Sequence, residues 1–88
     1  MISVREKNII KKLAGRYRAR RVLLFGSGLK KKRGHDIDLA VEGLPAKNFF
    51  EFYGDLMFSL SNPVDLIDLS KDSRFTRLVR REGLPIYG

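Results

Sequence analysis

The chain has 88 residues, no cysteine and a formal net charge of +8. This length predicts a single domain over residues 1–88 with a small core, and the lack of cysteine excludes disulfides and thiolate metal sites. No apolar run approaches the ~18 residues that cross a bilayer, and the first residues are not those of a secretory signal, so we expect a cytoplasmic protein without membrane contact.

The first part of the chain predicts a helix and then a strand. Ile9, Leu13 and Tyr17 recur at helical spacing among basic residues, which predicts an amphipathic helix over residues 4–17. The short apolar run over residues 21–25 stops at glycine and predicts a buried strand. Ser27 is then suited to cap a helical turn.

Residues 36–41 predict a second strand because their character alternates. One face is apolar, and the other carries the carboxylates of Asp36 and Asp38. Gly43 and Pro45 mark the loop that follows.

A second helix is predicted over residues 46–60 by a set of apolar residues at helical spacing. These residues are Phe49, Tyr53, Leu56 and Leu60. Additional side chains make its apolar face wider than a single buried stripe needs. They are Phe50, Phe52, Met57 and Phe58. Two interpretations stay open: a small sheet covers these side chains, or they form a surface for a partner protein.

The segment VDLIDL over residues 64–69 predicts a third strand, with Asp65 on one face and Asp68 on the other. Asp72 or Ser73 can cap a final helix that ends at Gly83. Its predicted apolar face consists of Phe75, Leu78 and Val79.

Residues 84–87 are suited to an edge strand that completes the chain. Helices and strands therefore alternate along the sequence. This order predicts an α/β or α+β fold in which helices cover the face of a β-sheet.

Asp36 and Asp38 on one strand face are expected within roughly 7 Å of each other. Two carboxylates in a half-buried sheet would repel each other, and a divalent cation removes this conflict because Mg2+ prefers oxygen ligands. A third carboxylate from a neighbouring strand would allow two metal ions, an arrangement that serves phosphoryl transfer. Asp65 is the first candidate for that carboxylate and Asp68 is the second.

The Gly26-Ser27 turn could supply the phosphate-binding half of the same site. Glycine lets the backbone approach a phosphate closely, and N–H groups at the start of a following helix donate to its oxygens. Eight of the eighteen cations flank this turn, within residues 16–21 and 30–33. They are suited to hold a nucleotide or nucleic acid, or they are solvated charges.

The order FGS, polar loop, DIDLAV, VDLIDL resembles that of the minimal nucleotidyltransferases, the smallest members of the DNA polymerase beta-like nucleotidyltransferase superfamily. The closing REGLPIYG is similar to the usual final segment of that family. The resemblance implies the nucleotidyltransferase fold, a mixed sheet flanked by helices. It also implies binding of a nucleoside triphosphate, usually ATP, and transfer of a nucleotidyl group to an acceptor.

By this resemblance, Gly26 and Ser27 would hold the triphosphate, and Asp36 and Asp38 would bind Mg2+ ions. Asp65 would be the third metal ligand and would help to deprotonate the attacking hydroxyl. The loop over residues 28–35 departs from the family pattern because it is short and carries Gly28 where an arginine is common. Its cations at residues 30–33 are expected to take over charge neutralisation, and His35 is expected on the surface of the loop.

Our first hypothesis is an Mg2+-dependent nucleotidyltransferase that moves AMP from ATP to a hydroxyl acceptor. The resemblance implies a small helical partner of the HEPN type, with the chain acting as an antitoxin that modifies a tyrosine of the partner toxin. The alternative is a catalytically degenerate binding module that neutralises a protein partner or binds RNA. Nucleic acid is the less favoured ligand because the acidic pair would repel it. The oligomeric state, including a homo-oligomer, stays open.

Overall fold

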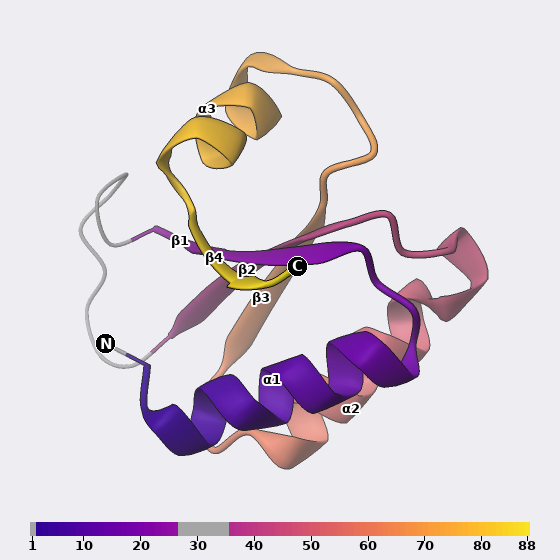
Figure 1. Cartoon of the computed structure of the whole chain (residues 1–88), viewed down its shortest axis with the longest axis vertical. Helices are drawn as coiled ribbons and strands as arrows, with labels where there is room; N and C mark the ends of the chain where they lie inside the picture. Colours follow the sequence, from indigo (N-terminus) through magenta and orange to yellow (C-terminus); the bar gives the residue numbers. More distant parts are fainter. Residues whose placement is uncertain (1, 27–35) are drawn as a thin grey trace.

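The computed structural model describes residues 2–26 and 36–88 (Figure 1). Its elements are α1 (Val4–Arg16), β1 (Arg21–Phe25), β2 (Ile37–Glu42), the short 3-10 helix η1 (Ala46–Asn48), α2 (Phe49–Ser59), β3 (Val64–Asp68), α3 (Arg74–Glu82) and β4 (Leu84–Tyr87). The predicted helices and strands are thus present, and their ends shift by up to three residues. Asp36 lies just before β2, and the strand continues to Glu42 because this residue pairs with Arg21 of β1.

The four strands of the described chain form one mixed sheet in the order β3-β2-β1-β4. β1 runs antiparallel to β2 and β4, whereas β2 and β3 are parallel. A parallel pair needs a long crossover connection, and α2 supplies it. The predicted fold class, a small mixed sheet flanked by helices, is therefore confirmed, and β4 occupies the predicted edge.

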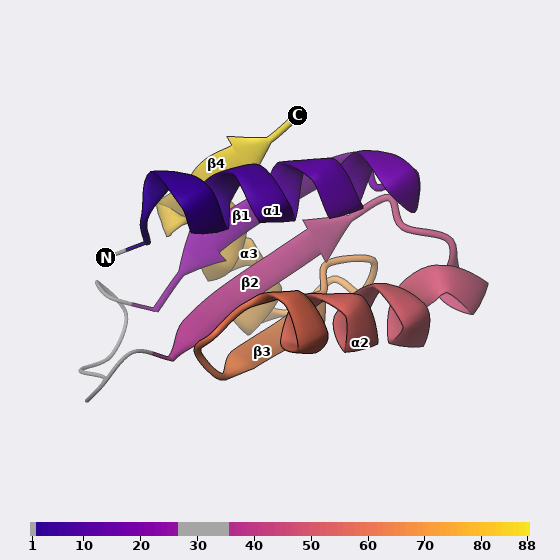
Figure 2. The same cartoon turned by 90° about the horizontal axis from the view of Figure 1, so that it is seen from below.

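The helices form layers on both sides of the sheet. α1 and α2 lie side by side on one face, and α3 covers the other (Figures 1 and 2). Among the residues that the structure describes, no helix has both the length and the apolar character needed to span a membrane.

Two apolar cores hold these layers together. The larger one lies between the sheet and the pair α1 and α2. Its fully buried members are Ile10, Ala14, Val22, Leu39, Val41, Phe52 and Leu56. The smaller one, under α3, consists of Leu23, Ala40, Leu69 and Val79. Alternate residues of β1 and β2 thus face opposite cores, as the period of two in a strand requires.

Polar contacts fix α1 against α2 and its flanking segments. The hydroxyl of Tyr17 donates a hydrogen bond to Asp55 of α2, and the amide of Asn48 donates to the carbonyl oxygen of Tyr17 at 3.1 Å. At the other end of α1, the Asn62 amide donates to Glu6 at 3.0 Å. These contacts tie both ends of α1 to the crossover connection between β2 and β3.

The members of the two predicted apolar faces differ in burial. Phe52 is buried, but Phe50, Met57 and Phe58 are 81%, 56% and 91% exposed, so the sheet does not cover the whole apolar face of α2. In α3, Val79 is buried as predicted, whereas Phe75 is 47% exposed. The buried residues of this short helix are Thr76 and Val79, three residues apart. Phe75 therefore lies at the edge of the buried face of α3.

Candidate active site

One end of the sheet brings together the residues that the sequence singles out. β1 ends where the antiparallel β2 begins, so Phe25 is the pairing partner of Asp38. β3 runs parallel to β2, so it begins at the same end, and Asp65 is the partner of Asp38 on that side. Adjacent strands lie about 4.8 Å apart, and paired residues point to the same face. The three residues therefore form a row on the face covered by α3.

Gly26 lies directly against this row. Its φ angle of +107° is one that side chains disfavour, and a Cβ atom added there would lie 2.3 Å from Oδ2 of Asp38. Glycine is therefore required both for the turn out of β1 and for the close approach to the carboxylate.

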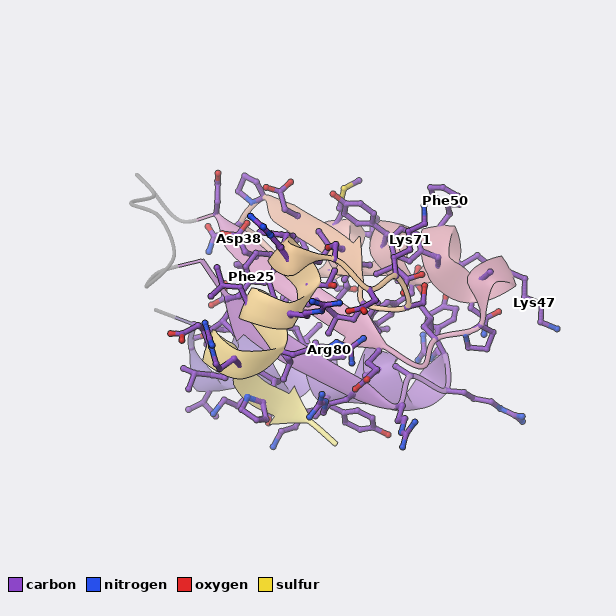
Figure 3. All side chains as sticks on the ribbon, turned by 90° about the horizontal axis from the view of Figure 1, so that it is seen from above. Phe25, Asp38, Lys47, Phe50, Lys71 and Arg80 are labelled. Atoms are coloured by element: carbon purple, nitrogen blue, oxygen red, sulfur yellow. The ribbon has the colours of Figure 1, made fainter. Side chains whose placement is uncertain are left out.

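The three candidate metal ligands differ in burial. Asp38 is only 4% exposed, whereas Asp36 and Asp65 are exposed. In Figure 3, Asp38 lies next to Phe25 at the end of the sheet opposite to Lys47 and η1. The site thus combines one buried carboxylate, fixed on the central strand β2, with two carboxylates that solvent and a ligand can reach.

The pairing of β3 with β2 separates Asp65 from Asp68. Asp65 is in register with Asp38, whereas Asp68 is in register with Val41, three residues further along. Asp68 also has a local role, because its Oδ1 accepts a hydrogen bond of 2.9 Å from the backbone N–H of Ser70. Of the two aspartates, only Asp65 lies beside Asp38.

The carboxylates of Asp36, Asp38 and Asp65 lie at one end of the sheet, but they do not enclose a metal site. Within residues 2–26 and 36–88, no three acidic or histidine side chains are gathered so that they could hold a metal ion as they stand. Ser27, with its predicted helical turn, and the cations at residues 30–33 lie outside the described residues.

The arginines of residues 16–21 lie away from this row, although they precede Gly26 in sequence. Arg20 and Arg21 are at the start of β1, about 13 Å from its other end at 3.3 Å per residue. Together with Glu42 and Gly88, they line a hollow at that end of the sheet. Sequence proximity to the Gly-Ser turn therefore does not bring these cations to the carboxylates.

Glu42 forms ion pairs with two arginines, one on the sheet and one on α3. Its carboxylate pairs with Arg21 of β1 at 2.9 Å and with Arg80 of α3, which also donates a hydrogen bond to the carbonyl oxygen of Leu69. Burial raises the pKa of Glu42, but the hydrogen bond from Arg80 and the two positive charges outweigh it and hold this pKa below its ordinary value. This ion-pair network fixes the position of α3 over β1.

Two aromatic residues at the site were not identified from the sequence. The rings of Phe25 and Phe75 meet edge to face, with centroids 5.9 Å apart. The contact joins the end of β1 to the first turn of α3, and it lies beside Asp38 because Phe25 is its pairing partner. Residues so far apart in the chain share no local pattern, so only the packing of α3 reveals the pair.

Comparisons with known proteins agree with this geometry. The family model "Polymerase beta, Nucleotidyltransferase" matches residues 7–88. No curated protein sequence matches the chain.

Three solved structures are similar over most of the chain. A crystal structure of the toxin–antitoxin MntA–HepT has 27% identity and a TM-score of 0.73, and the match covers 98% of this chain and 73% of that one. A mutant of the MntA toxin–antitoxin, with two aspartates two positions apart changed to glutamate, has 28% identity, a TM-score of 0.73 and coverage of 93% and 72%. A toxin–antitoxin crystallised with AMP-PNP has 31% identity, a TM-score of 0.72 and coverage of 93% and 73%.

Proposed function

This chain belongs to the polymerase beta nucleotidyltransferase family, and we propose that it transfers AMP from ATP to a hydroxyl group of an acceptor. The pairing of Asp38 with Asp65 on neighbouring strands, with Gly26 against Asp38, carries this proposal. It combines a glycine turn at the end of β1 with carboxylates that suit a divalent cation. The similar structure with AMP-PNP supports a nucleotide as the donor substrate.

We propose that Asp36, Asp38 and Asp65 hold Mg2+, with two ions in the complete site. The residues fit such a group because all three offer hard oxygen ligands, and Asp36 and Asp65 are exposed. When bound, the ions would stabilise charge on the attacking and leaving oxygens. The paired substitutions in the related mutant support this choice, since its two aspartates have the spacing of Asp36 and Asp38.

The chain's own residues would align the reactants for displacement at the α-phosphorus. Gly26 and Ser27 would bind the triphosphate through backbone N–H groups. Asp65 is exposed and would accept the proton of the acceptor hydroxyl. The hydroxyl oxygen would bond to the α-phosphorus while the bond from this phosphorus to the bridging oxygen breaks, and pyrophosphate would leave with that electron pair.

We propose that the acceptor is a tyrosine of a small helical toxin of the HEPN type and that this chain is its antitoxin, acting in the cytoplasm. The similar toxin–antitoxin structures support this role. The α2 apolar face, defined by Phe50, Met57 and Phe58, supports contact with a protein. Side chains of this size are usually covered, and Gly54 between them leaves room for a partner side chain, with nothing within 4 Å of its added Cβ.

The test is transfer of labelled AMP to the co-expressed partner by single Asp-to-Asn variants. We expect Asp36→Asn, Asp38→Asn and Asp65→Asn to lower the transfer rate by about 100-fold or more, because each removes a ligand charge worth several kcal/mol in the transition state. Asp68→Asn is the matched control from the same strand and should keep its activity. Undiminished transfer by the Asp38→Asn variant would refute the proposed site.

A mass measurement distinguishes this enzyme from a binding module. The partner toxin should gain the mass of whole AMP units when it is co-expressed with the unmodified chain, and it should gain none with the Asp38→Asn variant. A toxin that is neutralised equally by both, without a mass change, would favour the binding module.

A further inference from the structure

The contact between Phe25 and Phe75 has no role in the transfer step described above. Phe25 is half-buried and packs against the smaller core, so its position is fixed. Phe75 stands on the first turn of α3 with 47% of its surface exposed. Their edge-to-face arrangement, with ring planes at 77°, holds Phe75 while leaving part of its surface open to a ligand.

α3 is held on the sheet by contacts other than the ring of Phe75. Val79 is fully buried, Thr76 is 6% exposed, and Arg80 bonds to Glu42 and to the carbonyl of Leu69. Ser73 caps the helix by accepting a hydrogen bond from the backbone N–H of Thr76 at 3.1 Å. The exposed part of the Phe75 ring, at the rim of a polar site, is therefore available to contact a ligand.

The position of the pair matches the base of a nucleotide rather than its phosphates. Phe25 is the pairing partner of Asp38 on the same face of the sheet, and Gly26 follows it directly. A triphosphate held at Gly26 and Asp38 therefore has an aromatic surface beside it. Phosphates gain nothing from such a surface, whereas a nucleobase stacks on it through its π-face.

We propose that Phe75, supported by Phe25, is the stacking platform for the nucleobase of the donor nucleotide. This inference rests on the proposed function, because it needs a triphosphate bound at Gly26 and Asp38. A stacked aromatic ring makes no hydrogen bonds to the base, so it cannot distinguish one base from another by such bonds. The pair therefore supplies affinity for any nucleobase and does not by itself select adenine.

The experiment compares binding of ATP, GTP and inorganic tripolyphosphate, each with Mg2+, to the full chain and to Phe75 variants. Phe75→Ala should raise the Kd for ATP and for GTP by about 5- to 150-fold, the range expected for loss of one stacked base, and leave the Kd for tripolyphosphate unchanged. Phe75→Tyr should restore nucleotide binding. Phe75→Leu keeps the apolar bulk without the aromatic face and should behave like the alanine variant.

The control is Val4→Ala, which removes apolar bulk of 75% exposure from α1 and should leave all three Kd values unchanged. If Phe75→Ala raised the Kd values for tripolyphosphate and ATP equally, Phe75 would have a structural role and the inference would be overturned. Unchanged ATP binding in that variant would also overturn it. If the unmodified chain binds neither ATP nor tripolyphosphate, the proposed function fails and the inference fails with it.

Discussion

Gly26 connects backbone conformation with the chemistry of the site. Its positive φ of +107° lets the chain turn out of β1, and its missing side chain leaves room for the carboxylate of Asp38. A Cβ atom at residue 26 is thus excluded both by the backbone conformation and by the position of the Asp38 carboxylate. This distinguishes Gly26 from Gly54, which lies in the middle of α2 with nothing within 4 Å of an added Cβ.

Replacing these two glycines by alanine should have opposite effects. Gly26→Ala should lower the free energy of unfolding by about 1–3 kcal/mol because of backbone strain, and it should lower AMP transfer by about 100-fold because the Asp38 carboxylate must move. Gly54→Ala should raise the free energy of unfolding by about 0.5–1 kcal/mol, since alanine favours the helix. Denaturant unfolding measures the change in stability of each variant, and a transfer assay measures the activity of Gly26→Ala. A Gly26→Ala variant with full activity would show that the position of the Asp38 carboxylate against residue 26 is not needed for transfer.

At the level of elements, the pairing of β1, β2 and β3 creates the site, and α3 closes one side of it. The antiparallel and parallel pairings bring the end of β1 to the starts of β2 and β3. α3 then adds Phe75 from the face that carries Asp38. Its position depends on a small core and on the ion pairs of Glu42 with Arg21 and Arg80.

The Glu42 network should give the stability of the chain a defined pH dependence. The folded state lowers the pKa of Glu42 below the ordinary value of 4.5, so folding is favoured by the ionised form. This stabilisation is fully present above pH 4.5 and is lost as the pH falls through the lower pKa of the folded state. We expect Glu42→Gln to lower the free energy of unfolding by about 1 kcal/mol at pH 7.

Thermal unfolding of both forms between pH 7 and pH 3 measures this effect. The difference in Tm should be largest near neutral pH and should shrink below pH 4.5. Glu51→Gln, on the exposed surface of α2, is the control and should change Tm little at either pH. A Glu42→Gln difference that grows as the pH falls would contradict the assigned direction of the pKa shift.

At the scale of the whole molecule, different helices cover the two faces of the sheet. The α3 side holds the row of site residues, whereas α1 and α2 cover the other side (Figures 1 and 2). The α2 apolar face is exposed, and its member Phe50 lies away from Asp38, towards Lys47 (Figure 3). A protein bound at Phe50 would therefore lie away from Asp38.

Serine substitution on the α2 apolar face should weaken the toxin complex without unfolding the chain. Phe50 and Phe58 are 81% and 91% exposed, so the double variant Phe50→Ser/Phe58→Ser removes contact area from the complex and little from the core. We expect loss of co-purification with the toxin and a Tm within a few degrees of the unmodified chain. Val4→Ser, at a site of 75% exposure on α1, is the matched control and should co-purify normally. Undisturbed co-purification of the double variant would exclude this face as the docking surface.

The sequence by itself determined the helices, the strands and the residue types of the site. Local spacing predicts the elements because helices repeat about every 3.6 residues and strands every two. The β1 bounds match the prediction, and Ser73 and Gly83 cap α3 as expected. The family resemblance also followed from local segments, and the matching family model confirms it.

Only the tertiary structure decided which of these residues lie together. The register of β3 on β2 brings Asp65 rather than Asp68 beside Asp38, and the length of β1 takes Arg20 and Arg21 away from Gly26. Strand pairing and helix packing join residues that are distant in the chain, so no local period encodes them. For the same reason, the burial of Phe52, the exposure of Phe58 and the meeting of Phe25 with Phe75 became visible only when the sheet and its helices were assembled.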